Sequence, residues 1–254
     1  MGSAMLAGWR ERGLAPSVAI DPAPEAARNA GPDLRVVADA SQVPADFAPA
    51  AVVLAVKPQN AAAVLPLHAR HAGRAVFLSI MAGRTLGGMR GLLGAGAAVV
   101  RAMPNTPAAV RQGITVACPG PGVAAAQRDL CDSLLQAIGQ VAWVEDEGLL
   151  DPVTAVSGSG PAYVFLLAEL MEQAAVAQGI PPALARQLAR QTVAGSGALL
   201  AASAEESAAL RVAVTSPGGT TQAALNVLMA QDAWPALMQQ AIAAATARSR
   251  ELAG

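Results

Sequence analysis

The first part of the chain alternates short apolar runs with segments of helical periodicity. Most of the runs are aliphatic and lack polar alternation, as expected for buried strands with helices on both faces. Helices are predicted between them, near residues 3–12, 23–30, 59–70, 85–93 and 124–138. This alternation predicts an α/β domain with a parallel sheet over residues 1–146. The predicted strands are Ser17–Asp21, Leu34–Val37, Ala51–Val56, Ala75–Ile80, Ala98–Met103, Ile114–Cys118 and Ala142–Val144.

From Glu147 onward the pattern contains helices and no convincing strand. Pro161 suits the first turn of a long helix, and Gly179 followed by Pro181 ends that helix. The spacing of Ser203 and Glu206 predicts a capping box at the start of a later helix. Residues 147–254 are therefore predicted to form a separate, all-helical domain. Its helices are expected over residues 161–178, 182–202, 204–214, 220–227 and 234–252.

Residues 215–221, with the sequence TSPGGTT, lie between two predicted helices. Pro217 cannot continue the first helix, and Gly218 and Gly219 permit a turn with positive φ. Thr220 suits the N-cap of the second helix. Such a turn directs unpaired N–H groups, hydroxyls and a positive helix end toward one point, which suits a small carboxylate. A plain glycine turn between packed helices is the alternative interpretation.

The chain enters a helical pattern at Gly2, where a dinucleotide-binding fold normally has a strand and a G-x-G-x-x-G turn before the helix. Gly2 fits the third glycine of that turn, so the first strand of the fold is missing from the pattern. Asp21 ends the next predicted strand, about 20 residues later, where an acidic side chain binds ribose hydroxyls and disfavours a 2′-phosphate. A cap on the segment that begins at Pro22 explains Asp21 equally well.

Three further predicted strands end in loops that carry candidate contacts. In an open α/β sheet the ligand lies beyond the carboxyl ends of the strands, so these loops predict one edge of a nucleotide cleft. Lys57 suits a phosphate or ribose contact there better than a Schiff base. Ser159, before the helix at Pro161, could contact a nicotinamide amide or substrate, with a tight crossover as the alternative. The three loops are Ala55-Val56-Lys57-Pro58, Ile80-Met81-Ala82-Gly83 and Met103-Pro104-Asn105-Thr106-Pro107.

Charge and residue composition argue against several classes of function. A formal charge of −1 gives no electrostatic case for nucleic acid or an anionic membrane. No uninterrupted apolar run approaches the roughly 20 residues of a membrane span. Cys118 and Cys131 do not make a disulfide framework, which favours a reduced, cytoplasmic setting. His68 and His71 have no cysteine or carboxylate cluster beside them, so no metal site is predicted.

Four blocks of sequence resemble those of a known family. They are residues 55–58 (AVKP), 100–107 (VRAMPNTP), 151–163 (DPVTAVSGSGPAY) and 215–221 (TSPGGTT). In this order, and over the whole chain, the sequence resembles pyrroline-5-carboxylate reductase, the last enzyme of proline synthesis. The resemblance implies a Rossmann-like N-terminal domain, an all-helical dimerisation domain and hydride transfer from NADPH or NADH to the imine carbon of 1-pyrroline-5-carboxylate.

The resemblance also implies roles for individual residues. Ser216 and Thr221 would be catalytic, with Thr221 hydrogen-bonded to the ring nitrogen and assisting its protonation. Glu147 falls on a substrate-proximal glutamate. The residues that would hold the substrate carboxylate are those of the turn, Ser216, Gly218, Gly219, Thr220 and Thr221. The cofactor-binding positions are Gly2, Asp21, Ala55, Val56, Lys57, Pro58, Ile80, Met81, Ala82, Asn105 and Ser159.

The implied partners are the small cyclic imine and a second copy of the chain, bound through the helical domain. The choice between NADH and NADPH stays open, as does further assembly of dimers into a ring. Ala40 and Ala213 stand where the family often has polar residues. The family's first strand and its glycine turn have no counterpart before Gly2, so we expect the coding sequence upstream of Met1 to continue in frame with an apolar strand ending in G-x-G.

Two other functions remain open from the sequence. A β-hydroxyacid dehydrogenase-like reductase has a similar layout but normally carries a lysine in its helical domain, and Lys57 is the sole lysine of the chain. A non-catalytic relative, which dimerises and binds a small carboxylate, would explain the missing strand and glycine turn. Saturable binding of NADH distinguishes the enzyme from that relative.

Overall fold

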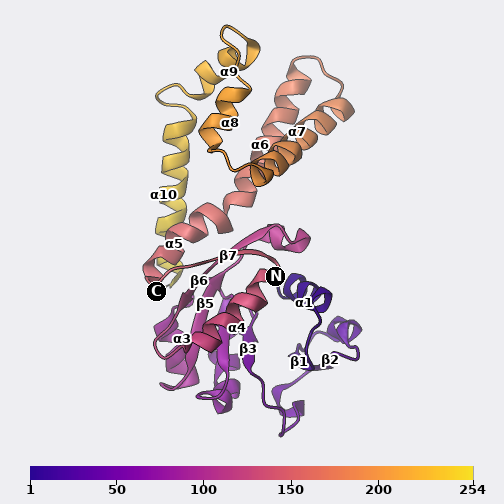
Figure 1. Ribbon diagram of the computed structural model, residues 1–254, viewed down its shortest axis with the longest axis vertical. Coiled ribbons are helices and arrows are strands. Elements are labelled where there is room, and N and C mark those ends of the chain that lie inside the picture. Colours follow the sequence, from indigo (N-terminus) through magenta and orange to yellow (C-terminus); the bar gives the residue numbers. More distant parts are fainter. Residues whose placement is uncertain (254) are drawn as a thin grey trace. The chain divides into compact units, whose positions relative to one another are not determined.

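The computed structural model describes residues 1–253, and Figure 1 labels its helices and strands. The chain divides into two compact units. The first contains Met1–Gly158 together with the C-terminal residues from Thr246 onward, and the second contains Ser159–Ala245. The division falls later than the predicted boundary at 146/147, because the first turns after Glu147 pack on the sheet, where Leu150 is fully buried.

Seven strands form within residues 1–253, one at each predicted position. Five of them make one sheet in the order β3-β4-β5-β6-β7, and the other two make a separate parallel pair, β1-β2. The register places Leu54, Ser79 and Arg101 side by side across three neighbouring strands. The strands are β1 (Ser17–Ile20), β2 (Leu34–Val37), β3 (Ala51–Leu54), β4 (Val76–Ser79), β5 (Ala98–Met103), β6 (Gly113–Pro119) and β7 (Gly139–Trp143).

One pair of strands runs against the predicted direction. β5 and β6 are antiparallel, whereas the other neighbours in the sheet are parallel. The connection between them is residues 104–112, and it contains the short 3₁₀ turn Thr106–Val110. Parallel strands need a crossover of about a dozen residues or more. The sheet is therefore parallel, as predicted, except at this one pair of strands.

The hydrogen-bonded sheet is interrupted between β1 and β3. Within the described residues no strand pairs with both, so β1-β2 stands apart from the five-stranded sheet. Helix α1 (Gly2–Glu11) ties the small pair to the rest, because Arg10 donates to Asp33 at 3.1 Å and to the Asn29 carbonyl.

Helices cover both faces of the five-stranded sheet (Figure 1). Successive residues Phe77 and Leu78 of β4 enter opposite cores, as the two-residue period of a strand requires. Met5 of α1 is fully buried on one face, and Met89 of α3 is almost fully buried on the other. Besides α1, the helices of this unit are α2 (Ala61–Val64), α3 (Leu86–Leu93), α4 (Ala125–Gln136) and α5 (Leu150–Val153).

Two predicted helices of the first unit have a different form. Residues 23–30 make a 3₁₀ turn, Pro24–Asn29, and the segment 59–70 contains α2 followed by a 3₁₀ stretch, Leu65–His71. Pro66 lies in the second segment, where its ring removes a donor and prevents a regular α-helix from continuing. These turns are tighter and shorter than the helices that the apolar pattern predicted.

The second unit is helical, as predicted. Gly179 adopts φ +88° and ends α6. The predicted capping box is wrong, because the Ser203 hydroxyl accepts from the Glu205 N–H at 3.1 Å and the next helix begins at Ser207 with Glu206 as its N-cap. The helices are α6 (Gly160–Ala177), α7 (Pro182–Ala202), α8 (Ser207–Ala213), α9 (Thr220–Leu228) and α10 (Trp234–Ala253), the last of which ends in the first unit.

The second unit leaves much apolar surface uncovered. α6 packs against α7 but has no buried residue, and Phe165 is 67% exposed. Gly195 and Gly197 of α7 are exposed, and a Cβ on either would meet nothing within 4 Å, so no other described part of the chain packs closely against them. The continuous helical run Glu147–Ala177 even passes as a candidate membrane span by length and hydropathy, with only 6% of its most apolar stretch buried.

Candidate functional site

The carboxyl ends of β3, β4 and β5 share one edge of the sheet, because these strands are parallel. The predicted cofactor segments lie in the loops that follow them: Ala55–Pro58 after β3, Ile80–Ala82 after β4 and Asn105 after β5. A Cβ on Gly2 would lie 3.5 Å from that of Ala55. The N-terminus of α1 therefore lies beside the loop after β3, and the structure brings Gly2 and the three segments to the same edge.

Three predicted cofactor residues already make bonds of their own. Met81 is buried, with 1% of the residue exposed, and its N–H donates to the Ser79 hydroxyl at 3.3 Å. The Asn105 side-chain oxygen accepts from the Ile114 N–H at 3.0 Å and thereby fixes the connection between β5 and β6. Asp21 is exposed, and its carboxylate accepts from the Ala23 N–H at 3.0 Å. This bond forms a turn just before the 3₁₀ segment Pro24–Asn29, whose N-cap is Ala23, so Asp21 does not cap the helix itself.

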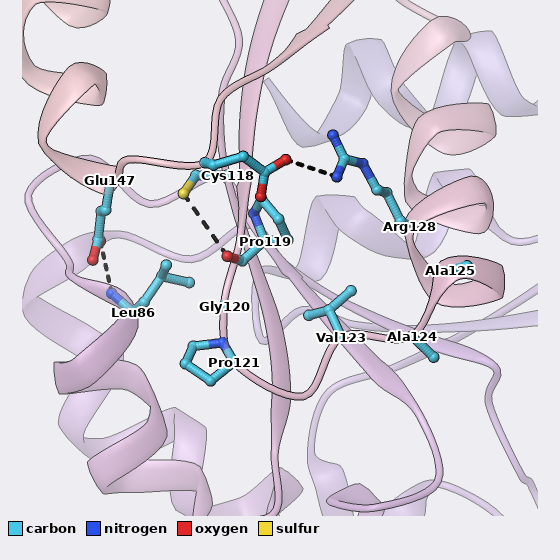
Figure 2. A pocket seen from close by; sticks show the side chains of 11 residues that line it. Leu86, Cys118, Pro119, Gly120, Pro121, Val123, Ala124, Ala125, Arg128 and Glu147 are labelled. Carbon is cyan, nitrogen blue, oxygen red and sulfur yellow. Dashed lines mark hydrogen bonds and ion pairs between the residues drawn. The ribbon is translucent and has the colours of Figure 1, made fainter.

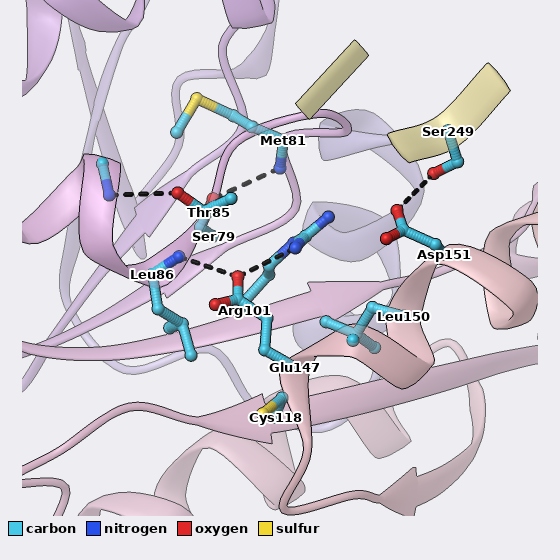
Figure 3. A network of polar contacts seen from close by, with 12 residues as sticks. Ser79, Met81, Thr85, Leu86, Arg101, Cys118, Glu147, Leu150, Asp151 and Ser249 are labelled. Carbon is cyan, nitrogen blue, oxygen red and sulfur yellow. Dashed lines mark hydrogen bonds and ion pairs between the residues drawn. The ribbon is translucent and has the colours of Figure 1, made fainter. Parts of the chain in front are cut away.

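Glu147 lies where three elements meet on the face of the sheet (Figure 3). Its Oε1 accepts from the Leu86 N–H and from Arg101 Nη1, both at 2.8 Å. Leu86 is the first residue of α3, so the carboxylate sits at the positive end of that helix. Arg101 comes from the middle of β5. Glu147 therefore joins β5, the start of α3 and the segment that leads into the helical unit.

Arg101 is an unusual residue for the centre of a strand. Only 3% of its side chain is exposed, and its Nε and Nη2 have no partner among the described residues. A buried charge is costly unless it is paired, so the ion pair with Glu147 offsets the cost of burying the guanidinium. Sequence analysis missed Arg101, although an arginine inside an otherwise aliphatic strand was the available signal.

A cavity of about 550 Å³ lies beside Glu147 within the first unit (Figure 2). Its charged wall includes Arg128, which donates to Glu145 at 2.8 Å and lies 4.6 Å from the centre of the Trp143 ring. Cys118 also lines it. Burial, and then the negative charge of Glu147, raise the pKa of the Cys118 thiol to about 11. The thiol is therefore protonated near neutral pH and is no nucleophile.

The turn at residues 216–221 belongs to the helical unit. Gly218 has φ +71° as predicted, but Gly219 has φ −79° and is itself the N-cap of α9, one residue before the predicted cap at Thr220. The first hydrogen bond of α9 joins Ala223 N–H to the Gly219 carbonyl, so the N–H groups of residues 220–222 point out of the helix end. Within residues 1–253, no hydrogen bond engages the hydroxyl of Ser216 or Thr221.

The small-residue run before α6 is itself helical. Residues Thr154–Gly158 form a π-helical turn, a form that is frequent at functional sites. The hydroxyls of Thr154 and Ser157 bond to the carbonyls four residues earlier, at 2.6 and 3.0 Å. Ser159 is the N-cap of α6 and the first residue of the second unit.

Comparison with known proteins shows the family of this chain. Residues 147–252 match the family model for pyrroline-5-carboxylate reductase dimerisation. The whole chain aligns at 39% identity with pyrroline-5-carboxylate reductase of Pseudomonas aeruginosa, of which it covers 93%. The chain belongs to the pyrroline-5-carboxylate reductase family. A second member of this family, from Synechocystis sp., is 40% identical over 87% of the chain and 79% of that protein.

Solved structures of pyrroline-5-carboxylate reductases share the fold. The Coxiella burnetii structure superposes with a TM-score of 0.90 at 30% identity and covers 100% of this chain and 95% of that one. The Plasmodium falciparum structure, which has NADP bound, superposes with a TM-score of 0.82 at 26% identity and the same coverage. The predicted fold, a Rossmann-like sheet domain followed by a helical dimerisation domain, is confirmed.

Proposed function

We infer that this protein reduces 1-pyrroline-5-carboxylate to L-proline with NADPH or NADH, the last step of proline biosynthesis. The observation that carries this function is the 39% identity to a pyrroline-5-carboxylate reductase over the entire chain. The non-catalytic alternative is not favoured, since the chain also aligns with further reductases at about the same identity. Bound NADP in a related structure supports a nicotinamide dinucleotide as the cofactor.

The cofactor is placed at the edge formed by the carboxyl ends of β3, β4 and β5. Gly2 at the start of α1 and the loops at residues 55–58 and 80–82 supply main-chain groups and little side-chain bulk there. Lys57 is exposed at this edge and is available to a phosphate or ribose. When bound, the reduced nicotinamide supplies the hydride, and the residues of this chain orient it.

The substrate carboxylate is assigned to the turn Ser216–Thr221. The unpaired N–H groups at the start of α9 and the positive end of that helix favour a small anion. The Thr221 hydroxyl makes no bond within the described chain, which leaves it available to the ring nitrogen. Hydride adds to the imine carbon and the nitrogen carries a proton, so the product is a secondary amine. Ser216 assists from the same turn.

Glu147 is assigned a place near the substrate. Its Oε1 is engaged by Leu86 and Arg101, so it is the second carboxylate oxygen that faces a ligand. About 28% of the side chain is exposed, which leaves that oxygen accessible. Ser159, at the N-cap of α6, is assigned to the cofactor on the strength of its position only.

A homodimer through the helical unit completes the proposal. The exposed apolar surface of α6 and the open glycines Gly195 and Gly197 of α7 suit close packing of a second copy. Such packing offsets the roughly 1 kcal/mol that each glycine costs inside a helix. A partner helix, not a bilayer, is the occupant we assign to the apolar run Glu147–Ala177. Cys118 and Cys131 are buried and form no disulfide, which accords with the cytoplasmic location that we propose. The net charge of −1 gives no reason to propose a nucleic-acid partner.

A steady-state assay tests the function. Purified protein is mixed with the cyclic imine and either NADPH or NADH, and consumption of the reduced cofactor is followed together with formation of proline. Turnover that needs both reactants is expected, and none with either cofactor would overturn the assignment. Light scattering of the same sample is expected to give twice the 25.4 kDa of the chain or an even multiple of it, which also reports whether dimers close into a ring. A monomer would contradict the dimer.

A further inference from the structure

The loops that follow β3 and β4 are joined at both of their ends. At the base, the Ile80 N–H donates to the Leu54 carbonyl at 3.2 Å and continues the strand pairing. Farther along, Arg84 donates to the Pro58 carbonyl twice, from Nε at 3.0 Å and from Nη2 at 2.7 Å. Residues 55–57 and 81–83 lie between these two links. We call this closed pair of loops the bracket, residues 54–58 and 80–84.

The second loop of the bracket is fixed by contacts elsewhere in the sheet unit. The first loop has a local bond, from the Asn60 N–H to the Lys57 carbonyl at 2.9 Å, and Ala55 lies beside Gly2 of α1. Gly83 has φ +66°, and a Cβ on it would lie 3.0 Å from the Leu252 carbonyl at the end of α10. The Leu86 N–H, just beyond the loop, is bound by Glu147. Between the two loops themselves, the part of the chain described here has no hydrogen bond beyond those of Ile80 and Arg84. Arg84 is therefore the side chain that links the far ends of the two loops.

We propose that Arg84 is a positioning residue for the nicotinamide cofactor, acting by holding the bracket at the spacing that the cofactor requires. The proposal rests on the cofactor site assigned above to this edge of the sheet. A guanidinium is a planar, rigid fork, and its two bonds to one carbonyl fix both distance and direction in a way that a single ammonium cannot. Loops that are ordered beforehand lose less freedom when a ligand binds, which strengthens binding without a new contact.

The test compares three variants with the unmodified protein. Arg84→Met removes every donor but keeps the length of the side chain, and Arg84→Lys keeps the charge with one point of donation. Arg90→Met is the matched control, because Arg90 also donates to a main-chain carbonyl, that of Ala95 at 2.8 Å, but does so at the far end of α3. The measurements are NADPH affinity by fluorescence titration, kcat and KM for both reactants, and the melting temperature.

For Arg84→Met we expect the Kd and KM for NADPH to rise roughly three- to tenfold, which is the effect of freeing a few ordered side chains and loop residues. The kcat at saturating cofactor, the KM for the imine and the melting temperature are expected to stay close to those of the unmodified protein. Arg84→Lys is expected to recover part of the affinity, and Arg90→Met to match the unmodified protein. The ratio of Kd values should be the same at low and high salt, because the bond at issue does not contact the cofactor phosphates.

Several outcomes would overturn the proposal. One is an unchanged NADPH affinity in Arg84→Met while the unmodified protein binds, and this outcome leaves the cofactor site and the reductase function standing. Others are a loss of affinity that disappears at high salt or is fully restored by lysine, which would indicate a direct charge contact, and a loss matched by an equal fall in melting temperature. If the unmodified protein itself binds neither NADPH nor NADH, the assigned cofactor site fails together with this proposal.

Discussion

Arg101 and Glu147 are joined at 2.8 Å although 46 residues separate them along the chain. The arginine side chain is 3% exposed and that of the glutamate is 28% exposed. The pair therefore lies at the boundary between the core and solvent. The buried Arg101 depends on Glu147 to offset the cost of burying its charge. The same carboxylate also binds the start of α3, so one side chain serves both the stability of the sheet and the position of a helix next to the proposed site.

Glu147→Gln is expected to destabilise the protein by about 3 kcal/mol, because it leaves the buried Arg101 charge without a counter-charge. Equilibrium denaturation with urea measures the change. The control is Glu145→Gln, whose carboxylate pairs with the exposed Arg128, and its effect should stay below about 1 kcal/mol. The prediction is wrong if the two variants lose the same stability.

Thr221→Ala is expected to lower kcat by about one to two orders of magnitude, because it removes the hydroxyl assigned to the ring nitrogen. The melting temperature should hardly change, since no hydrogen bond within the described chain depends on that hydroxyl. Thr221→Ser keeps the hydroxyl and should retain most of the rate. If the alanine variant turns over at the normal rate, Thr221 has no part in the mechanism.

Gly8→Ala is expected to destabilise the protein by about 1–3 kcal/mol, despite the better helix propensity of alanine. The new methyl would press on the Ala137 carbonyl and lie 3.2 Å from the Ala137 Cβ, where α1 crosses the end of α4. Gly91→Ala provides the comparison, because nothing lies within 4 Å of its Cβ position in α3, and should stabilise by roughly 0.5–1 kcal/mol. Thermal unfolding of both variants gives the sign, and a gain from Gly8→Ala would refute the close contact.

Stability is expected to fall at alkaline pH through the two thiols. Burial raises the pKa of Cys118 to about 11 and that of Cys131 to about 12, from an ordinary value of 9.0. Each raised pKa contributes stability that is fully present below pH 9. This stability is lost as the pH rises from about 9 through 11 for Cys118 and through 12 for Cys131, because the thiols ionise first in the unfolded chain. Unfolding free energies measured near pH 8 and near pH 10.5 should differ less in a variant with both cysteines replaced by alanine. Equal pH dependence in the two proteins would contradict the shifts.

Much of this fold follows from local sequence signals. Strand positions were predictable because most of the strands are continuous aliphatic runs without polar alternation, and the stop at Gly179 followed from its tolerance of positive φ. The reversed direction of β6 was also within reach, since residues 104–112 are too few for a parallel crossover. The capping error at Ser203 has a different origin, because a serine hydroxyl can bond to the nearest N–H and form a turn outside the helix.

The candidate site also contains parts that local sequence could predict and parts that it could not. The turn at Ser216–Thr221 and the loops after β3 and β4 are continuous in sequence, so motif and residue type were enough to single them out. Arg84 and Arg101 act through partners that are 26 and 46 residues away, and no local pattern encodes such a distance. The return of α10 to the sheet unit is likewise a tertiary event, marked by the bond between Ser249 and Asp151 at 2.7 Å.

The return of α10 to the sheet unit affects the order in which the chain can fold during synthesis. A ribosome releases the N-terminal residues first, and domains commonly fold in that order during synthesis. Here the sheet unit includes residues from Thr246 onward, which emerge after the entire helical unit. The nascent sheet unit thus stays incomplete at the loop around Gly83 until the helical unit and the end of α10 have been synthesised.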